Sequence, residues 1–127
     1  MEELDDESKL CSMMLEANKN VRYAAVCNAD GKILWNCSRT DKDNIMSTGE
    51  TSDSLKRSLE NWKFREKLAP KIGRGRFVLV EYENLFRITV PLRNNHLLYV
   101  HVDPVKPEDM GDILKIVNWV KEHPLQT

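Results

Sequence analysis

The chain has 127 residues, of which 41% are hydrophobic and 31% are charged, and its formal net charge is −1 at pH 7. This length suits one domain with its own core, and the composition is ordinary for a soluble globular protein. No stretch approaches the roughly 18 apolar residues that span a bilayer, and the acidic start lacks the basic and then apolar pattern of a secretory signal. We therefore expect a cytoplasmic protein that forms one domain over residues 1–127, frayed at 1–4 and 124–127.

The first part of the chain predicts a helix followed by a hairpin. Apolar residues at helical spacing predict a helix over about 5–18, with acids in the first turns, where the helix dipole favours them. Residues 21–27 are apolar on both faces, which is typical of a strand in the middle of a covered sheet. Residues 28–31 form a glycine-containing turn, and residues 32–38 alternate as the returning strand.

A long central helix comes next, after a polar loop at 40–46. Ser47 and Glu50 have the spacing of a capping box, so we expect the helix to begin at Thr48. It should continue to about Ala69, where Pro70 marks its end or a kink. Its apolar stripe consists of Leu55, Leu59, Trp62 and Ala69, with Leu68 and Ile72 close to it.

Three closely spaced strands follow, at 77–82, 85–92 and 97–102, joined by the short turns Glu83-Asn84 and Asn94-Asn95. Pro91 cannot donate a ladder hydrogen bond, so we expect it at a strand end or a bulge. A last helix should begin near Pro107 and end at His123.

The order α-ββ-α-βββ-α predicts an α+β fold, in which helices cover both faces of a five-stranded antiparallel sheet. Strands that are apolar on both faces need helices on both sides, so the expected architecture is a three-layer α/β/α sandwich. We expect the first and last helices to share one face and the central helix to cover the other. The strand at 77–82 should form an exposed edge.

Charge is unevenly distributed along the chain. Six acids and a single lysine precede residue 17, whereas residues 56–76 hold eight bases and two acids. Such a basic segment attracts acidic partners, and it can also attract the acidic start of the same or another chain. The candidate partner or dimer surface consists of Leu55, Leu59, Trp62, Lys63, Phe64, Arg65, Lys67, Lys71, Arg74, Arg76 and Phe77.

Within that surface, apolar and charged side chains have different expected roles. Apolar contact should come from the two leucines, Trp62 and Phe77, and steering of an acidic partner from Lys63, Arg65, Lys67 and Arg74. Trp62 lies on the helical stripe, which favours a core or dimer-interface position. Phe64 lies off the stripe and, if exposed, is a candidate partner contact, because lone aromatics often anchor interfaces.

A resemblance to a known family rests on three segments. They are the strand-turn-strand from Tyr23 to Trp35, the long helix after it, and the strands of residues 77–102. Their order resembles the roadblock/LC7 family, within the profilin-like and longin-like group. Roadblock domains place an Asp-Gly hairpin after the first helix, where this chain has Asp30 and Gly31.

The roadblock resemblance implies a non-enzymatic module that homodimerises through the central helix and the edge strand after it. Such dimers regulate small Ras-like GTPases or scaffold larger assemblies, and the corresponding surface here would be residues 56–82. Short stretches that begin at Ser54, Lys71 and Arg87 also resemble a family of short, uncharacterised archaeal proteins, a resemblance that brings no known activity.

No catalytic, cofactor-binding or metal-binding residue is predicted. His96, His101 and His123 lie in no Ser/His or Cys/His signature and are interpreted as structural. The acid pairs at 5–6 and 108–109 are typical of helix starts.

The cysteines predict neither a zinc site nor a redox pair. Cys11, Cys27 and Cys37 are odd in number and lack ligand spacing, so we interpret them as free thiols that pack like small hydrophobes. Cys27 and Cys37 flank one turn, which makes cross-strand contact an alternative.

Two other functions remain open. A PAS-like or profilin-like sensor would hold a small molecule in a cavity lined by residues such as Tyr23, Trp35, Phe86 and Tyr99. Without such a cavity, Trp35 and Trp119 are interpreted as core residues. Nucleic acid could be bound through Lys71, Arg74 and Arg76, although the glycines at 73 and 75 follow a helix and so do not form a P-loop.

Overall fold

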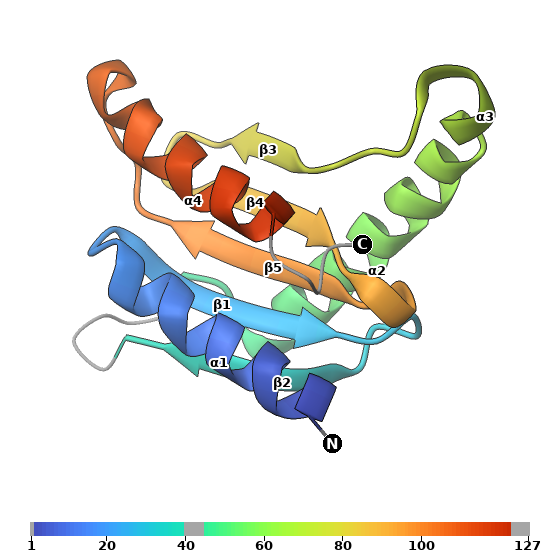
Figure 1. The fold of residues 1–127 in the computed structure, drawn as a ribbon. Helices are drawn as coiled ribbons and strands as arrows, with labels where there is room; N and C mark the ends of the chain where they lie inside the picture. Colours follow the sequence, from blue (N-terminus) through green and yellow to red (C-terminus); the bar gives the residue numbers. More distant parts are fainter. Residues whose placement is uncertain (1, 40–44, 123–127) are drawn as a thin grey trace.

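The computed structural model describes residues 2–39 and 45–122, and its side chains from residue 6 onward within these ranges (Figure 1). The predicted loop at 40–46 therefore lies mostly outside the described residues, as does His123. The elements are α1 (Glu2–Ala17), β1 (Val21–Cys27), β2 (Ile33–Ser38), α2 (Thr48–Glu66), α3 (Ala69–Ile72), β3 (Val78–Glu81), β4 (Phe86–Pro91), η1 (Arg93–Asn95), β5 (Leu97–Val102), η2 (Pro107–Asp109) and α4 (Met110–Glu122).

The five strands form one antiparallel sheet in the order β2-β1-β5-β4-β3. β1 and β5 lie in the middle, which explains why residues 21–27 and 97–102 are apolar on both faces. β3 pairs with β4 alone, so the prediction that this strand is an edge is confirmed. Pro91 ends β4, as its missing N–H requires.

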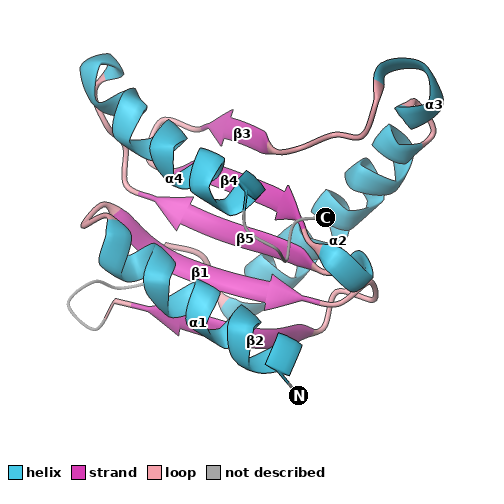
Figure 2. Ribbon diagram, in the orientation of Figure 1, coloured by secondary structure: helices cyan, strands magenta, loops and turns pink. Residues whose placement is uncertain are grey.

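Helices cover both faces of the sheet, as expected from the element order (Figures 1 and 2). α1 and α4 lie on one face, where side chains such as Leu10, Met14, Ile113 and Val117 pack on alternate residues of β1, β4 and β5. α2 lies on the other face, where a smaller cluster fills the space beneath it: Cys27, Leu55, Trp62, Leu97 and Tyr99. The structure thus confirms the α/β/α arrangement.

The start of α2 agrees with the prediction, but its end does not. The Glu50 N–H donates to Ser47 Oγ at 3.1 Å and the Ser47 N–H donates to Glu50 Oε1 at 2.9 Å, so the capping box is present. The helix ends at Glu66, earlier than Ala69, and Pro70 occupies the first turn of the separate α3. Because the axis breaks there, Leu68 and Ile72 leave the apolar stripe and are exposed.

Two other packing predictions need correction. The sequence predicts Trp119 in the core, but this residue is 39% exposed on α4. Cys27 and Cys37 are not cross-strand neighbours, because Cys37 pairs with Ala24 and the two thiols face opposite sides of the sheet. All three cysteines are free. Burial raises the pKa of Cys11 to about 12 and that of Cys27 to about 11, so both thiols stay protonated and pack as small hydrophobes.

Candidate protein-interaction surface

The apolar residues expected to present a surface are mostly buried within the single chain. Leu55 is fully buried and Trp62 is 7% exposed, both between α2 and the sheet. Leu59 is partly buried against the same cluster. Phe77 packs on the opposite face of the sheet, where Lys121 Nζ lies 5.4 Å from its ring centroid. The sheet therefore covers Leu55 and Trp62, and these two cannot supply apolar contact to a partner of the folded chain. Leu59 and Phe77 are half-buried, and for them the expectation stays a prediction.

Other large hydrophobic side chains are exposed near the same elements. Phe64, on the outer side of α2, is 66% exposed, as a partner contact requires. Leu68 and Ile72 follow it at the end of the helical segment, with 44% and 78% exposure. Val80 and Tyr82 are exposed at the end of the edge strand. Phe64 is among the predicted surface residues, whereas the other four are not. Alternation along strand 77–82 could have indicated the outward positions of Val80 and Tyr82.

A hollow of about 430 Å³ separates α2 from β3, and we call it the α2–β3 groove. Its floor includes Thr89 and Arg87 of β4, and its walls include Val80 and Tyr82. From α2 it is lined by Glu50, Asp53, Ser54, Arg57, Ser58, Asn61, Trp62 and Arg65. The groove therefore combines an unpaired strand edge with a polar helix flank, and acids precede bases along that flank.

A buried polar network lies at the floor of this groove. The Tyr99 hydroxyl is 2.8 Å from both Ser54 Oγ and His101 Nε2. Burial, with Arg87 and Arg22 nearby, lowers the pKa of His101 from 6.5 to about 3, so the imidazole is neutral at physiological pH. Burial likewise raises the pKa of Tyr99. These shifts keep the network uncharged apart from Arg87, whose guanidinium stacks over Tyr82 and Tyr99.

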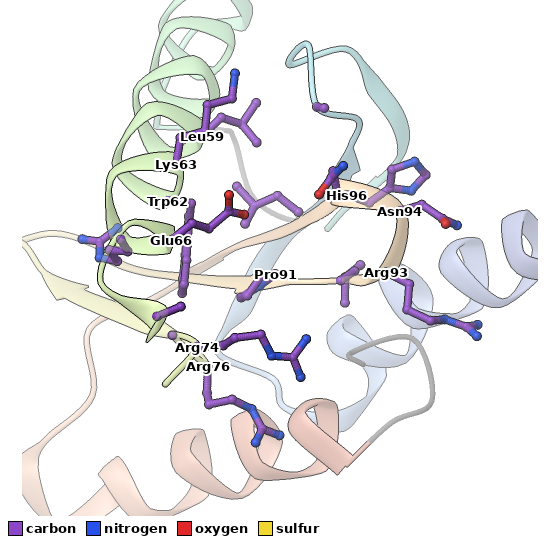
Figure 3. Close-up of a pocket in the computed structure, with 17 residues that line it drawn as sticks. Leu59, Trp62, Lys63, Glu66, Arg74, Arg76, Pro91, Arg93, Asn94 and His96 are labelled. Carbon is purple, nitrogen blue, oxygen red and sulfur yellow. The ribbon is translucent and has the colours of Figure 1, made fainter. Parts of the chain in front are cut away.

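A second hollow, of about 380 Å³, lies on the other flank of α2, and we call it the basic pocket (Figure 3). It joins the second half of α2, the loop at 74–76 and the β4–β5 turn. Its cationic lining residues are Lys63, Arg65, Arg74, Arg76 and Arg93, and its single acidic lining residue is Glu66. Apolar lining comes from Ala29, Leu59, Trp62, Ala69, Pro91, Leu92 and Leu97.

Gly75 explains how the loop at 74–76 lies so close to α2. A Cβ atom at this position would be 2.6 Å from a ring carbon of Trp62, which is closer than real contacts allow. The glycine backbone therefore packs directly on the indole and places Arg74 and Arg76 at the mouth of the basic pocket. The Arg76 guanidinium also donates to the Lys121 carbonyl at 3.1 Å, which anchors it to α4.

The β4–β5 turn forms the far wall of the basic pocket. Asn94 and Asn95 both have positive φ, 63° and 61°, which the short turn requires and which asparagine tolerates. Next to them, His96 Nδ1 lies 2.6 Å from Glu7 Oε2, which ties the turn to α1. The sequence predicts the Asn94-Asn95 turn and groups Lys63, Arg65, Arg74 and Arg76. It does not place the turn beside these bases, because nothing in the local pattern links it to α2.

The remaining predicted surface residues lie outside both hollows. Lys67 is exposed, with its Nζ 5.8 Å from the Phe64 ring centroid. Lys71 is exposed on α3. The residues suggested for a sensor cavity do not share one space, because Tyr23 and Tyr99 face α2 whereas Trp35 and Phe86 face α1 and α4.

Within residues 2–39 and 45–122, no group of three or more His, Cys, Asp or Glu side chains could hold a metal ion. None of the helices in that part of the chain is long and apolar enough to cross a membrane. The surface features described above are an open strand edge, a polar groove and a basic pocket.

Comparison with solved structures identifies the fold as that of roadblock/LC7 domains. The gliding protein MglB from Thermus thermophilus matches with a TM-score of 0.73 and 14% identity, over 94% of this chain and 85% of that one. MglB from Myxococcus xanthus matches with a TM-score of 0.66 and 15% identity, over 96% of this chain and 90% of that one. The Roadblock/LC7 domain from Streptomyces avermitilis matches with a TM-score of 0.62 and 12% identity, over 90% of this chain and 93% of that one. No protein-family model and no curated protein matches the sequence. The expected roadblock/LC7-like fold is confirmed.

Proposed function

We propose that this chain is a non-enzymatic, cytoplasmic protein-interaction module that forms a homodimer through α2 and β3. The observation that carries the proposal is the α2–β3 groove, which lies beside an unpaired strand edge with two exposed hydrophobic residues, Val80 and Tyr82. An exposed edge strand offers unpaired N–H and C=O groups to a second strand. One of the solved structures of the same fold is described as MglB with a tetrameric arrangement, so chains of this fold do assemble.

Charge along the groove supports pairing between two copies. Glu50 and Asp53 line its first half, whereas Arg57 and Arg65 line its second half. In a two-fold symmetric dimer the same surface of each copy meets the other. With the two-fold axis perpendicular to α2, the two α2 helices cross antiparallel. The acidic half of one helix then faces the basic half of its partner, and the charges attract rather than repel.

The partner of such a dimer is, on the roadblock resemblance, a small Ras-like GTPase or another acidic protein that the dimer regulates or scaffolds. Exposed bases outside the groove support an acidic partner: Lys63, Lys67, Lys71 and Arg74. Charge of this kind raises association rates with an acidic surface more than it raises affinity.

Light scattering after size-exclusion chromatography tests the dimer. We expect the wild-type chain to elute with twice the mass of a single chain, and Val80→Asp to elute as a single chain. Leu114→Asp is the matched control, because Leu114 is 39% exposed on α4, on the other face of the sheet. Variants at Trp62 or Leu55 are unsuitable, because these residues are core and their loss would unfold the chain. A wild-type chain that stays monomeric at high concentration would contradict the proposal.

The regulatory role is tested separately, once the dimer is established. Small Ras-like GTPases of the same organism, loaded with a GTP analogue or with GDP, are titrated with the dimer. We expect one nucleotide state to bind preferentially, and Lys63→Glu combined with Lys67→Glu to weaken that binding. If no GTPase binds in either state, the dimer remains but its assignment to GTPases is wrong.

A further inference from the structure

The basic pocket lies outside the proposed dimer surface, on the opposite flank of α2. The two hollows share Trp62 and Arg65 as a dividing wall, but the remaining lining residues of the basic pocket include the loop at 74–76 and the β4–β5 turn. We infer that the basic pocket binds an acidic peptide segment of a partner protein, in which an apolar side chain is flanked by carboxylates. This inference deepens the proposed function, on which it rests, by naming the surface that the acidic partner occupies.

Cations at both ends of the pocket favour an extended acidic ligand. Lys63 points toward one end, whereas Arg74 and Arg76 point toward the other (Figure 3). Lys63 and Arg74 are exposed and form no ion pair or hydrogen bond within the described part of the chain. Two cationic ends that point away from each other match carboxylates spaced along a peptide better than a single compact anion (Figure 3).

The middle of the pocket favours an apolar group between those carboxylates. Leu59, Pro91 and Leu97 line this part, and none of them carries a polar side chain. The volume of the pocket, about 380 Å³, lies within the range of about 300–1,000 Å³ that is typical of ligand pockets. An apolar side chain placed there would remove nonpolar surface from water on both molecules.

Glu66 argues against phosphate and nucleic acid as the ligand. Its side chain points from α2 into the space between the helix and the β4–β5 turn (Figure 3). A carboxylate at this point repels any anionic group beside it, but it can accept a hydrogen bond from a peptide N–H. The peptide backbone therefore fits next to Glu66, with the peptide carboxylates toward Lys63 and Arg74. The pocket therefore combines a repulsive and an attractive element, which is how a site distinguishes one class of anion from another.

The pocket is also held in shape by the protein. Gly75 packs against Trp62, the Arg76 guanidinium is tied to the last turn of α4, and His96 is tied to Glu7 of α1. Three elements that are distant in sequence therefore fix the loop and the turn that form its mouth. A pre-formed site loses less conformational entropy when it binds a ligand.

Selection from a phage-displayed library of random heptapeptides tests the inference on the full chain. We expect the wild type to enrich peptides with acids on both sides of an apolar residue. In titrations of one selected synthetic peptide, Lys63→Glu combined with Arg74→Glu should raise the Kd by at least about tenfold, since two charge-pair contacts become repulsive. The matched control is Lys106→Glu with Lys115→Glu, which makes the same charge change at exposed lysines on the α4 side.

Three outcomes would overturn the inference. They are no enrichment of acidic peptides, equal binding by the Lys63→Glu, Arg74→Glu variant, or displacement of the peptide by inorganic phosphate or single-stranded DNA at lower concentrations than those of the peptide. The masses of the same samples separate this result from that of the dimer proposal. A monomeric chain that selects acidic peptides would support the peptide site and contradict the dimer. A dimeric chain that selects no acidic peptides would support the dimer and contradict the peptide site.

Discussion

The indole N–H of Trp62 donates a 3.0 Å hydrogen bond to the hydroxyl of Thr89, and both side chains are buried. This contact joins α2 to β4 at the point where the indole separates the α2–β3 groove from the basic pocket. This buried polar pair therefore helps to fix the position of the helix, together with the apolar cluster beneath α2, and with it the shape of both hollows.

A double-mutant cycle on this pair measures its contribution to stability. Thr89→Val leaves a buried N–H without an acceptor, which costs about 1–3 kcal/mol of unfolding free energy. Trp62→Phe removes the donor and also leaves a cavity, so its cost should be larger. We expect the double variant to recover about 1 kcal/mol relative to the sum of the two single changes, measured by urea unfolding at one protein concentration. Additive effects would show that the two groups are not coupled.

Gly75 should be intolerant of even the smallest side chain, because the added methyl group would meet Trp62 at 2.6 Å. Forcing an atom into a packed contact costs about 1–3 kcal/mol, so we expect Gly75→Ala to lower the unfolding free energy by that amount. Gly49→Ala is the matched control, because it lies in the first turn of α2 with no atom within 4 Å of the added Cβ. That change should raise stability by about 0.5–1 kcal/mol. Equal responses at the two glycines would contradict the contact argument.

Much of the fold could be predicted because local sequence patterns, such as apolar periodicity and cap spacing, indicate individual helices and strands. The two-sided apolarity of residues 21–27 indicated a central strand, and the Ser47–Glu50 spacing indicated the start of α2. The role of the helical stripe was harder to assign. Periodicity shows that one face of a helix is buried but not what covers it, so Trp62 suited a core and a dimer interface equally well until the sheet was in place.

The candidate sites were less predictable, because they are made by contacts between distant segments. The basic pocket needs Lys63 of α2, Arg74 of the following loop and Arg93 of the β4–β5 turn in one place. The run of bases in the sequence contained the first two but gave no reason to include the third. The run also included Lys71, which lies on α3 after the helix break and does not line the pocket.

The neutral, buried His101 should make stability depend on pH. Its pKa is about 3 in the folded chain and 6.5 when solvated, so the unfolded chain binds more protons between these values. The contribution of His101 is therefore fully present above pH 6.5 and is lost as the pH falls toward 3. Where only the unfolded form is protonated, the loss is about 1.4 kcal/mol per pH unit.

Comparison with a variant that cannot titrate isolates this effect. We expect His101→Gln to show a shallower decrease in unfolding free energy between about pH 6.5 and about pH 4.5, in chemical denaturation series at matched ionic strength. The window ends at about pH 4.5 because carboxylates begin to titrate below it. Parallel pH profiles for the wild type and the variant would contradict a neutral His101.

Glu7 and His96 should stabilise the chain as a pair rather than singly. The Glu7 carboxylate is almost fully buried, with one oxygen 2.6 Å from His96 Nδ1 and the other without a hydrogen-bond partner within the described part of the chain. Removing the histidine leaves a buried acid uncompensated, so we expect His96→Leu to cost about 3–5 kcal/mol. The double variant Glu7→Leu, His96→Leu removes both groups and should be more stable than His96→Leu alone. Thermal or urea unfolding compares the stabilities of the two variants. A double variant that is less stable than His96→Leu would contradict the argument.

The proposed dimer makes a prediction about charge that depends on its symmetry. If two antiparallel copies of α2 cross near Arg57 and Asn61, Asp53 of one copy faces Arg65 of the other, and the same pair forms twice. Asp53→Arg alone then places like charges together at both pairs, so we expect the dimer dissociation constant to rise by at least about tenfold. Arg65→Asp alone should weaken the dimer as well, with a further loss because Arg65 stacks over the Trp62 ring at 5.2 Å.

The charge-swapped variant, Asp53→Arg with Arg65→Asp, separates pairing from general electrostatics. It restores opposite charges across the two-fold axis, so it should dimerise more tightly than either single variant in concentration-dependent light scattering. Lys63→Asp is the control, because Lys63 lines the other flank of α2 and its change should leave the dimer within about threefold of the wild type. If the double variant is as weak as the sum of the single changes, the helices do not cross in this register, and the dimer must use the β3 edge without this helix contact.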